Sequence, residues 1–122
     1  MCIAQRKWKR DEEMRIGFDA AREVSITHLK GGEGTVTAKM HMDPHNKIML
    51  SRLPAGTSIG MHRHTTSSEI NYVLSGAGKA LCDGVEEDLT AGVCHYCPKG
   101  SAHSIVNTGS EDLVLFTVVP EQ

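Results

Sequence analysis

The sequence predicts an all-β domain, either a sandwich or a barrel, from three observations. Short runs rich in β-branched and aromatic residues recur between residues 35 and 119 at near-regular spacing. Turn signatures built from Gly, Pro, Asn or Asp separate these runs, as in DPHN (43–46) and NTGS (107–110). No stretch shows a helical hydrophobic period of any length. Many short strands joined by tight turns are typical of sandwiches and barrels.

The individual strands follow in order after an N-terminal arm. Residues 1–23 are polar and charged, and the weak alternation of Met14, Ile16 and Phe18 predicts at most one short strand there. GGEG (31–34) predicts a turn. The predicted strands that follow are TVTAKMH (35–41), KIMLSRL (47–53), EINYVLS (69–75), GKALCD (78–83), VEEDLT (85–90), VCHYC (93–97), HSIVNT (103–108) and DLVLFTVV (112–119).

Length and composition exclude several classes of protein. A chain of 122 residues is long enough for one domain with its own core. The net charge of −2 comes from mixed charges, so no basic stripe predicts nucleic-acid binding. No apolar run approaches the length of a membrane span. The first residues are charged where a signal peptide needs a hydrophobic stretch, so we expect a cytoplasmic protein whose four cysteines are reduced.

Two of the seven histidines stand one residue apart in GMHRH (60–64). In a helix, positions i and i+2 point about 200° apart, whereas in a strand they project from the same face. If His62 and His64 act together, they must do so from a β-strand. Arg63 then points to the opposite face, where we expect a solvated or interface arginine.

Two longer motifs contain these histidines and a third one. Residues 56–76 follow the pattern G-x5-H-x-H-x4-E-x6-G, and residues 92–107 follow G-x5-P-x-G-x2-H-x3-N, with fifteen residues between them. In order and spacing, both resemble the two signature motifs of the cupin family, and the resemblance extends over about residues 31–119. This resemblance implies an RmlC-like jelly-roll β-barrel of six to eight strands in residues 31–122. Residues 1–30 would form an arm with an edge strand or a strand exchanged between subunits.

The resemblance also implies a metal site. Its ligands would be His62, His64, Glu69 and His103, whereas Asn107, Pro98 and the motif glycines would shape turns. The residues themselves agree, because the short TTSS turn brings Glu69 back beside the two histidines and the turn at 98–100 places His103. Three neutral imidazoles and one carboxylate suit one divalent transition metal ion (Mn, Fe, Ni or Zn) and leave coordination positions open.

The function predicted from this site is that of a small metalloenzyme acting on a small polar metabolite, either a carboxylate or a sugar-like molecule. Cupins with such a site include dioxygenases, isomerases, lyases and decarboxylases. The alternative is a metal-dependent binding protein that holds its ligand without turnover. A metal-free scaffold is disfavoured, because none of the four ligands is missing.

Several other residues receive predictions from strand alternation. If Glu69 faces inward, Asn71 and Val73 do too, and Asn71 becomes the candidate substrate contact; its amide could equally satisfy a neighbouring backbone group. The outward apolar residues of the same strand predict a homodimer. Cys94 and Cys97 form a CxxC pair, interpreted as packed thiols, and His95 between them is expected to stand outside the metal site. The sequence leaves open which of six side chains face the pocket: Lys47, Arg52, Lys79, Cys82, Cys94 and Cys97.

Overall fold

The structure is a computed structural model that describes residues 15–122, so Met14 and the start of the predicted arm lie outside the described residues. Ten β-strands and one 3-10 turn (η2, Leu29–Gly31) make up this part of the chain, which confirms the all-β prediction. None of its helical segments is long and apolar enough to cross a membrane. The strands are β1 (Glu23–Thr27), β2 (Thr35–Met42), β3 (Asn46–Leu53), β4 (Ser58–Arg63), β5 (Glu69–Ser75), β6 (Ala77–Cys82), β7 (Val85–Thr90), β8 (Cys94–Cys97), β9 (Ala102–Asn107) and β10 (Leu113–Pro120).

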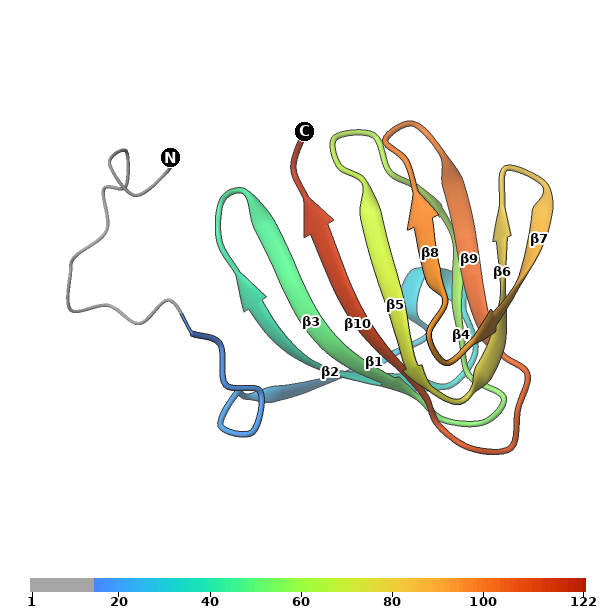
Figure 1. Ribbon diagram of the computed structural model, residues 1–122, viewed down its shortest axis with the longest axis horizontal. Helices are drawn as coiled ribbons and strands as arrows, with labels where there is room; N and C mark the ends of the chain where they lie inside the picture. Colours follow the sequence, from blue (N-terminus) through green and yellow to red (C-terminus); the bar gives the residue numbers. More distant parts are fainter. Residues whose placement is uncertain (1–14) are drawn as a thin grey trace.

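These strands form two antiparallel sheets that face each other (Figure 1). One sheet has six strands in the order β1-β2-β3-β10-β5-β8, and the other has four in the order β4-β9-β6-β7. This arrangement confirms the jelly-roll fold but corrects the expectation of a barrel with six to eight strands. The larger sheet is extended by β1, and no ladder joins the two sheets into a closed barrel among the described residues.

The eight predicted strands hold with end shifts of at most one residue, whereas β4 was expected only from the condition that His62 and His64 act together, and the arm differs. Ile16 and Phe18 do not form the strand suggested by their alternation, and residues 18–20 instead form a turn. The strand that the arm does contribute is β1, whose Val24 and Ile26 pair with β2 at the edge of the six-stranded sheet. EVSIT alternates apolar and polar residues, which suits an edge strand with one covered face.

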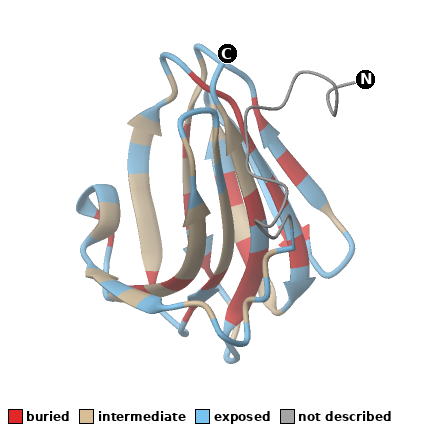
Figure 2. Cartoon of the chain, turned by 90° about the vertical axis from the view of Figure 1, so that its left-hand side faces the viewer, coloured by how far each residue is buried: buried red, intermediate tan, exposed pale blue. Residues whose placement is uncertain are grey.

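Buried and exposed residues alternate most clearly along β5 and β8 (Figure 2). On β5, Glu69, Asn71 and Val73 are buried, while the residues between them are exposed, as predicted. The apolar core lies between the sheets and consists of Val36, Leu53, Val73, Ala80, Leu89, Ile105, Leu113 and Leu115.

The interior changes from apolar to polar along the strands. Leu115 of β10 pairs with Val73 of β5, and two residues further on Thr117 pairs with Asn71. On β9, the buried His103 likewise occupies the inward position next to the buried Ile105. One end of the interior is therefore a hydrophobic core, and the other end carries the polar side chains of the candidate site.

Two residues of the signature motifs have structural roles here, as the resemblance implies. Gly76 has a positive φ of 91°, and a Cβ atom built on it would lie 2.4 Å from the Asp112 carbonyl oxygen, so only glycine fits. The Asn107 amide donates to the carbonyl oxygens of Leu53 and Glu111, both at 2.8 Å. These contacts hold the apolar end of the molecule together, away from the metal-ligand candidates.

Candidate metal centre

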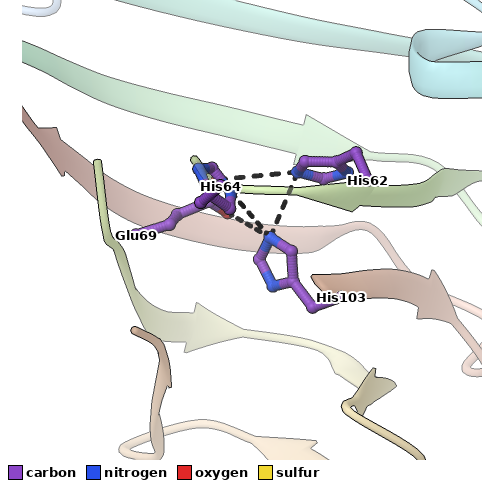
Figure 3. A group of neighbouring side chains, drawn as sticks. All are labelled: His62, His64, Glu69 and His103. Carbon is purple, nitrogen blue, oxygen red and sulfur yellow. Dashed lines mark hydrogen bonds and ion pairs between the residues drawn. The ribbon is translucent and has the colours of Figure 1, made fainter. Parts of the chain in front are cut away.

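The four predicted ligands converge at the polar end of the interior (Figure 3). His62 lies in β4, His64 follows one residue after that strand, Glu69 begins β5, and His103 lies in β9. One ligand atom from each residue can be chosen so that all four lie within 4.8 Å of one another. Strands from both sheets thus supply one compact cluster of nitrogen and oxygen donors.

The spacing of the donor atoms fits one shared ion. The Nε2 atom of His103 lies 3.2 Å from that of His62 and 3.1 Å from that of His64. A Glu69 carboxylate oxygen lies 3.0 Å from His64 Nε2 and 4.0 Å from His62 Nε2. Ligands at about 2.1 Å from one ion lie about 3.0 Å apart at a right angle and about 4.2 Å apart on opposite sides. The donor set, three imidazoles and one carboxylate, therefore suits a divalent transition metal.

Strand pairing and one tight turn account for this convergence. His62 pairs directly with His103 across the β4–β9 ladder, so both imidazoles leave adjacent backbone positions on one face. The backbone N–H of His64 donates to the Ser101 carbonyl oxygen at 3.0 Å, which ties His64 to the segment before β9. The short turn at residues 65–68 then returns the chain to Glu69 at the start of β5.

Hydrogen bonds on the far side of two rings orient them toward the centre. His62 Nδ1 lies 2.7 Å from the Gly60 carbonyl oxygen, which can only accept, so Nδ1 carries a proton; in the neutral ring, Nε2 then keeps its lone pair. His64 Nδ1 lies 3.2 Å from the Ser67 hydroxyl. A Cβ atom on Gly60 would lie 2.1 Å from the Lys30 carbonyl oxygen, so glycine allows the η2 segment to pack against β4 behind His62.

The carboxylate of Glu69 is held in its charged form. Burial alone would raise its pKa, but the adjacent imidazoles of His103, His62 and His64 outweigh burial, because each can hydrogen-bond to the carboxylate when it is protonated, and they keep the pKa well below its usual range. Conversely, the hydrogen bond with Glu69 raises the pKa of His62. The Asn71 amide also donates to the second Glu69 oxygen at 2.8 Å. The cluster is therefore a charged site whose negative member is firmly positioned.

Asn71 is buried beside the ligands, and its contacts are now explicit. Its Nδ2 donates to Glu69, and its Oδ1 accepts a hydrogen bond from the Thr117 hydroxyl at 2.6 Å. Asn71 and Thr117 both line the cavity beside the cluster. One N–H of the amide has no partner among these contacts.

His95 contributes to the site in a way that sequence reasoning missed. Its Nε2 lies 2.9 Å from Nδ1 of His103, and its Nδ1 lies 2.8 Å from a carboxylate oxygen of Glu87. His95 is not one of the four candidate ligands, as expected, but it contacts one of them directly. Alternation offered a signal, because His95 and Cys97 share the inward parity of β8 and are both buried. Glu87 likewise shares the parity of the buried Leu89 on β7, but it lies in the other sheet, so alternation does not predict that it meets His95.

A cavity of about 500 Å³ opens beside the cluster between the two sheets. His62, His64 and Glu69 form part of its wall, whereas His103 is fully buried behind them. Much of the remaining wall is apolar, and it includes Val36, Ala38, Met40, Met49, Ile59 and Leu115. Three basic side chains also line the cavity: Lys30, Lys47 and Arg63. Arg63 is exposed and donates to the Gly100 carbonyl oxygen at the rim.

Of the six side chains left open by the sequence, only Lys47 lines this cavity. Arg52 forms an ion pair with Asp112 at 3.6 Å, and Lys79 pairs with Glu86 and Asp88 on the exposed face of β6 and β7. The described cysteines are free thiols, of which Cys94 is exposed, Cys82 half-buried and Cys97 buried. Burial raises the pKa of the Cys97 thiol to about 12. The interpretation of packed thiols therefore holds for Cys97 and not for Cys94, which lies on the opposite, exposed face of β8.

Together, the fold and the site define a jelly-roll protein with a three-histidine, one-carboxylate cluster facing an internal cavity. The protein-family model described as the cupin domain matches residues 49–119 of the sequence. The chain belongs to the cupin family. An oxalate-binding protein of Thermotoga maritima is 35% identical over 100 residues, which cover 77% of this chain and 83% of that protein.

Solved structures show the same relationship. A crystal structure described as a predicted oxalate decarboxylase from Thermotoga maritima superposes with a TM-score of 0.84 at 28% identity. The match covers 89% of this chain and all of that one (100%). An RmlC-like cupin from Shewanella frigidimarina gives a TM-score of 0.75 at 19% identity, over 91% of this chain and 93% of that one, and shares the fold.

Proposed function

We propose that the protein holds one divalent transition metal ion (Mn, Fe, Ni or Zn) on His62, His64, Glu69 and His103, and that a small carboxylate binds at the open positions of that ion. The convergence of three Nε2 atoms and one carboxylate at 3.0 to 4.0 Å carries this proposal. A bound metal ion would act as a Lewis acid toward an oxygen ligand.

The walls of the cavity support an anionic ligand with an apolar part. Lys30, Lys47 and Arg63 can pair with an anion, whereas Asp43, Glu69 and Glu121 on the same wall balance their charge, so the bound metal ion would supply the net attraction. The relative from Thermotoga maritima is described as binding oxalate, which is a small dicarboxylate. A cavity of about 500 Å³ has more room than oxalate needs, so the class of ligand extends to larger carboxylates.

Asn71 is the proposed contact for that ligand. Its oxygen is occupied by Thr117 and one N–H by Glu69, which leaves the second N–H to donate into the cavity. A carboxylate oxygen of the ligand is a suitable acceptor for this donor.

Catalysis and simple binding are the two forms that this function can take. The first is a metalloenzyme of the dioxygenase, isomerase, lyase or decarboxylase kind. The second is a binding protein without turnover, which the oxalate-binding relative favours.

The experiment that tests the proposal has two stages. Elemental analysis of protein purified without added metal should find one transition metal ion per chain. Calorimetric titration of the metal-loaded protein with oxalate, a larger monocarboxylate and a neutral sugar should then show binding of the carboxylates only. Consumption of O₂ or release of product would identify an enzyme, and recovery of unchanged ligand would identify a binding protein. Absence of metal from the purified and the reconstituted protein would overturn the proposal.

We also propose that the protein is a homodimer. An outer apolar patch on β5, β8 and β10 consists of Ile70, Tyr72, Leu74, Tyr96 and Phe116, all exposed. Monomers rarely expose contiguous apolar patches of this kind. Phe18, before β1, covers part of the patch through an edge-on contact with Phe116 at 6.4 Å between ring centroids. A cytoplasmic location remains a prediction from the sequence.

A further inference from the structure

Three side chains in consecutive contact connect the surface of the protein with the metal-ligand cluster. Glu87 lies on β7, His95 on β8 and His103 on β9. The contacts between them measure 2.8 Å and 2.9 Å, and both histidines are fully buried. The Glu87 side chain at the outer end is 46% exposed. β8 belongs to the six-stranded sheet and β7 and β9 to the four-stranded sheet, so these contacts cross the seam between the two sheets.

The direction of the hydrogen bonds follows from the acceptor at the outer end. A carboxylate can only accept, so His95 Nδ1 carries a proton and donates to Glu87. In a neutral imidazole the other nitrogen then has no proton, and His95 Nε2 is an acceptor. It can accept only from His103 Nδ1, which must therefore carry the proton of that ring. His103 Nε2 is left with its lone pair, and this atom is the one that points to the cluster.

We propose that His95, supported by Glu87, is a positioning residue for the metal centre: it holds His103 in the tautomer and orientation that metal binding requires. The inference rests on the proposed metal centre and names a residue outside the four ligands. The two rings are inclined by only 24°, so the N–H of His103 points along the plane of its acceptor. A ring partner backed by a carboxylate also makes a ligating imidazole a stronger donor, and such partners typically contribute about 10- to 100-fold to metal affinity.

His95 holds the Nδ1 atom of His103, whereas other kinds of group hold the Nδ1 atoms of the two other histidine ligands. The Nδ1 atom of His62 is held by a backbone carbonyl and that of His64 by the Ser67 hydroxyl, both from within four residues along the chain. His103 has no such local partner among the described contacts and depends on a side chain from another sheet. Substitutions in β7 and β8 should therefore change the metal centre without touching a ligand.

The test uses Co²⁺ as a spectroscopic probe with the full-length protein and four variants. His95→Phe removes the acceptor for His103. His95→Gln keeps an acceptor oxygen at that place. Glu87→Ala removes the outer carboxylate. The matched control is Glu86→Ala, which removes the same charge from the neighbouring residue of β7, whose side chain instead pairs with Lys79 at 3.2 Å.

We expect His95→Phe to weaken Co²⁺ binding about 10- to 100-fold and to change its visible absorption bands, which report the ligand field. His95→Gln should restore most of the affinity and the spectrum of the unchanged protein. Glu87→Ala should weaken binding less than His95→Phe, and Glu86→Ala should have no effect. A residue that merely closes the seam between the sheets would alter thermal stability but not the spectrum of the bound ion.

Two results would overturn the inference, and they are distinguishable. If the unchanged protein binds no Co²⁺, the metal centre itself is wrong, and the inference falls with it. If the unchanged protein binds Co²⁺ while His95→Phe and Glu87→Ala match it in affinity and spectrum, only the positioning role is wrong. Should His95→Phe fail to fold, Glu87→Ala decides alone, because its side chain is half-exposed and outside the core.

Discussion

His62 and His103 lie directly opposite each other in the β4–β9 ladder, and their Nε2 atoms are 3.2 Å apart. Two unprotonated imidazole nitrogens at this distance repel each other unless a proton or a cation lies between them. The pairing register therefore makes a positive charge between the two rings favourable, and a metal ion would supply that charge. The charged carboxylate of Glu69, at the start of β5, also favours a cation at this place.

The first prediction concerns the metal ligands. His62→Ala and His103→Ala each remove a donor atom that contacts the ion directly. Each should therefore lower metal affinity more than the loss of a residue that only hydrogen-bonds to a ligand, which typically costs about 10- to 100-fold. Elemental analysis after dialysis measures this loss. The control is His45→Ala, which removes an exposed imidazole outside the cluster. Circular dichroism should show the fold retained, since the hydrophobic core lies at the other end of the interior. A double variant, His62→Ala with His64→Ala, that kept one ion per chain would refute the site.

The second prediction concerns metal release by acid. Ligation requires neutral imidazole, so protons compete with the ion as the pH falls through about 6.5. We expect a chelator to remove the metal faster at about pH 5 than at about pH 8. Metal retention at a fixed chelator concentration measures the effect. Equal retention at both pH values would contradict ligation by histidine.

The third prediction concerns the metal-free protein, in which two opposite shifts act. The raised pKa of His62 stabilises the fold below its unfolded value of 6.5, and this contribution is lost as the pH rises through the folded value. The lowered pKa of Glu69 stabilises the fold above its unfolded value of 4.5, and this contribution is lost as the pH falls through the folded value.

The metal-free protein should therefore be most stable between about pH 4.5 and pH 6.5. Added metal should raise Tm more as the pH rises above this window, because the ion replaces the proton. Calorimetry of both forms across the pH range measures the difference. A metal-dependent gain in Tm that shrank with rising pH would be inconsistent with this account.

The fourth prediction separates ligand contact from structural support at Asn71. Asn71→Leu should weaken carboxylate binding while leaving metal content intact, and should cost about 1–3 kcal/mol of stability because the Thr117 hydroxyl loses its acceptor. The matched control is Thr117→Val, which disturbs the same hydrogen bond but keeps both N–H groups of the amide. It should lose stability and keep ligand binding. Loss of metal in Asn71→Leu would instead assign Asn71 to the support of Glu69.

The fifth prediction concerns assembly. Light scattering at micromolar concentration should give twice the 13.3 kDa mass of the chain, because the outer apolar patch needs a cover. Tyr72→Glu places a charge in the middle of the patch and should shift the mass toward the monomer. Val85→Glu is the control, since Val85 is 62% exposed in the other sheet. A monomer mass for the unchanged protein would rule out the dimer.

The fold class and eight of the strands, each within one residue, could be predicted from the sequence, and the resemblance of its two motifs to the cupin signature implied the four candidate ligands. These features follow from local rules: alternation assigns each residue of a strand to one face, and turn residues mark where strands end. The HxH spacing and the turn before Glu69 are equally local, so they predict that His62, His64 and Glu69 lie close together. Alternation also predicted that Asn71 is buried and that Tyr72 is exposed, as found.

Which side chains meet across the two sheets depends on the tertiary structure and could not be predicted from the sequence. The contact between Glu87 and His95 joins strands from different sheets, and its existence depends on how those sheets pack and twist. The edge position of β1 and the open seam between the sheets depend on the same packing. The cavity is likewise the space left between two facing walls, and strand alternation describes each wall separately. Face and register are properties of single strands and their neighbours, whereas the distance between sheets is set by all the side chains between them.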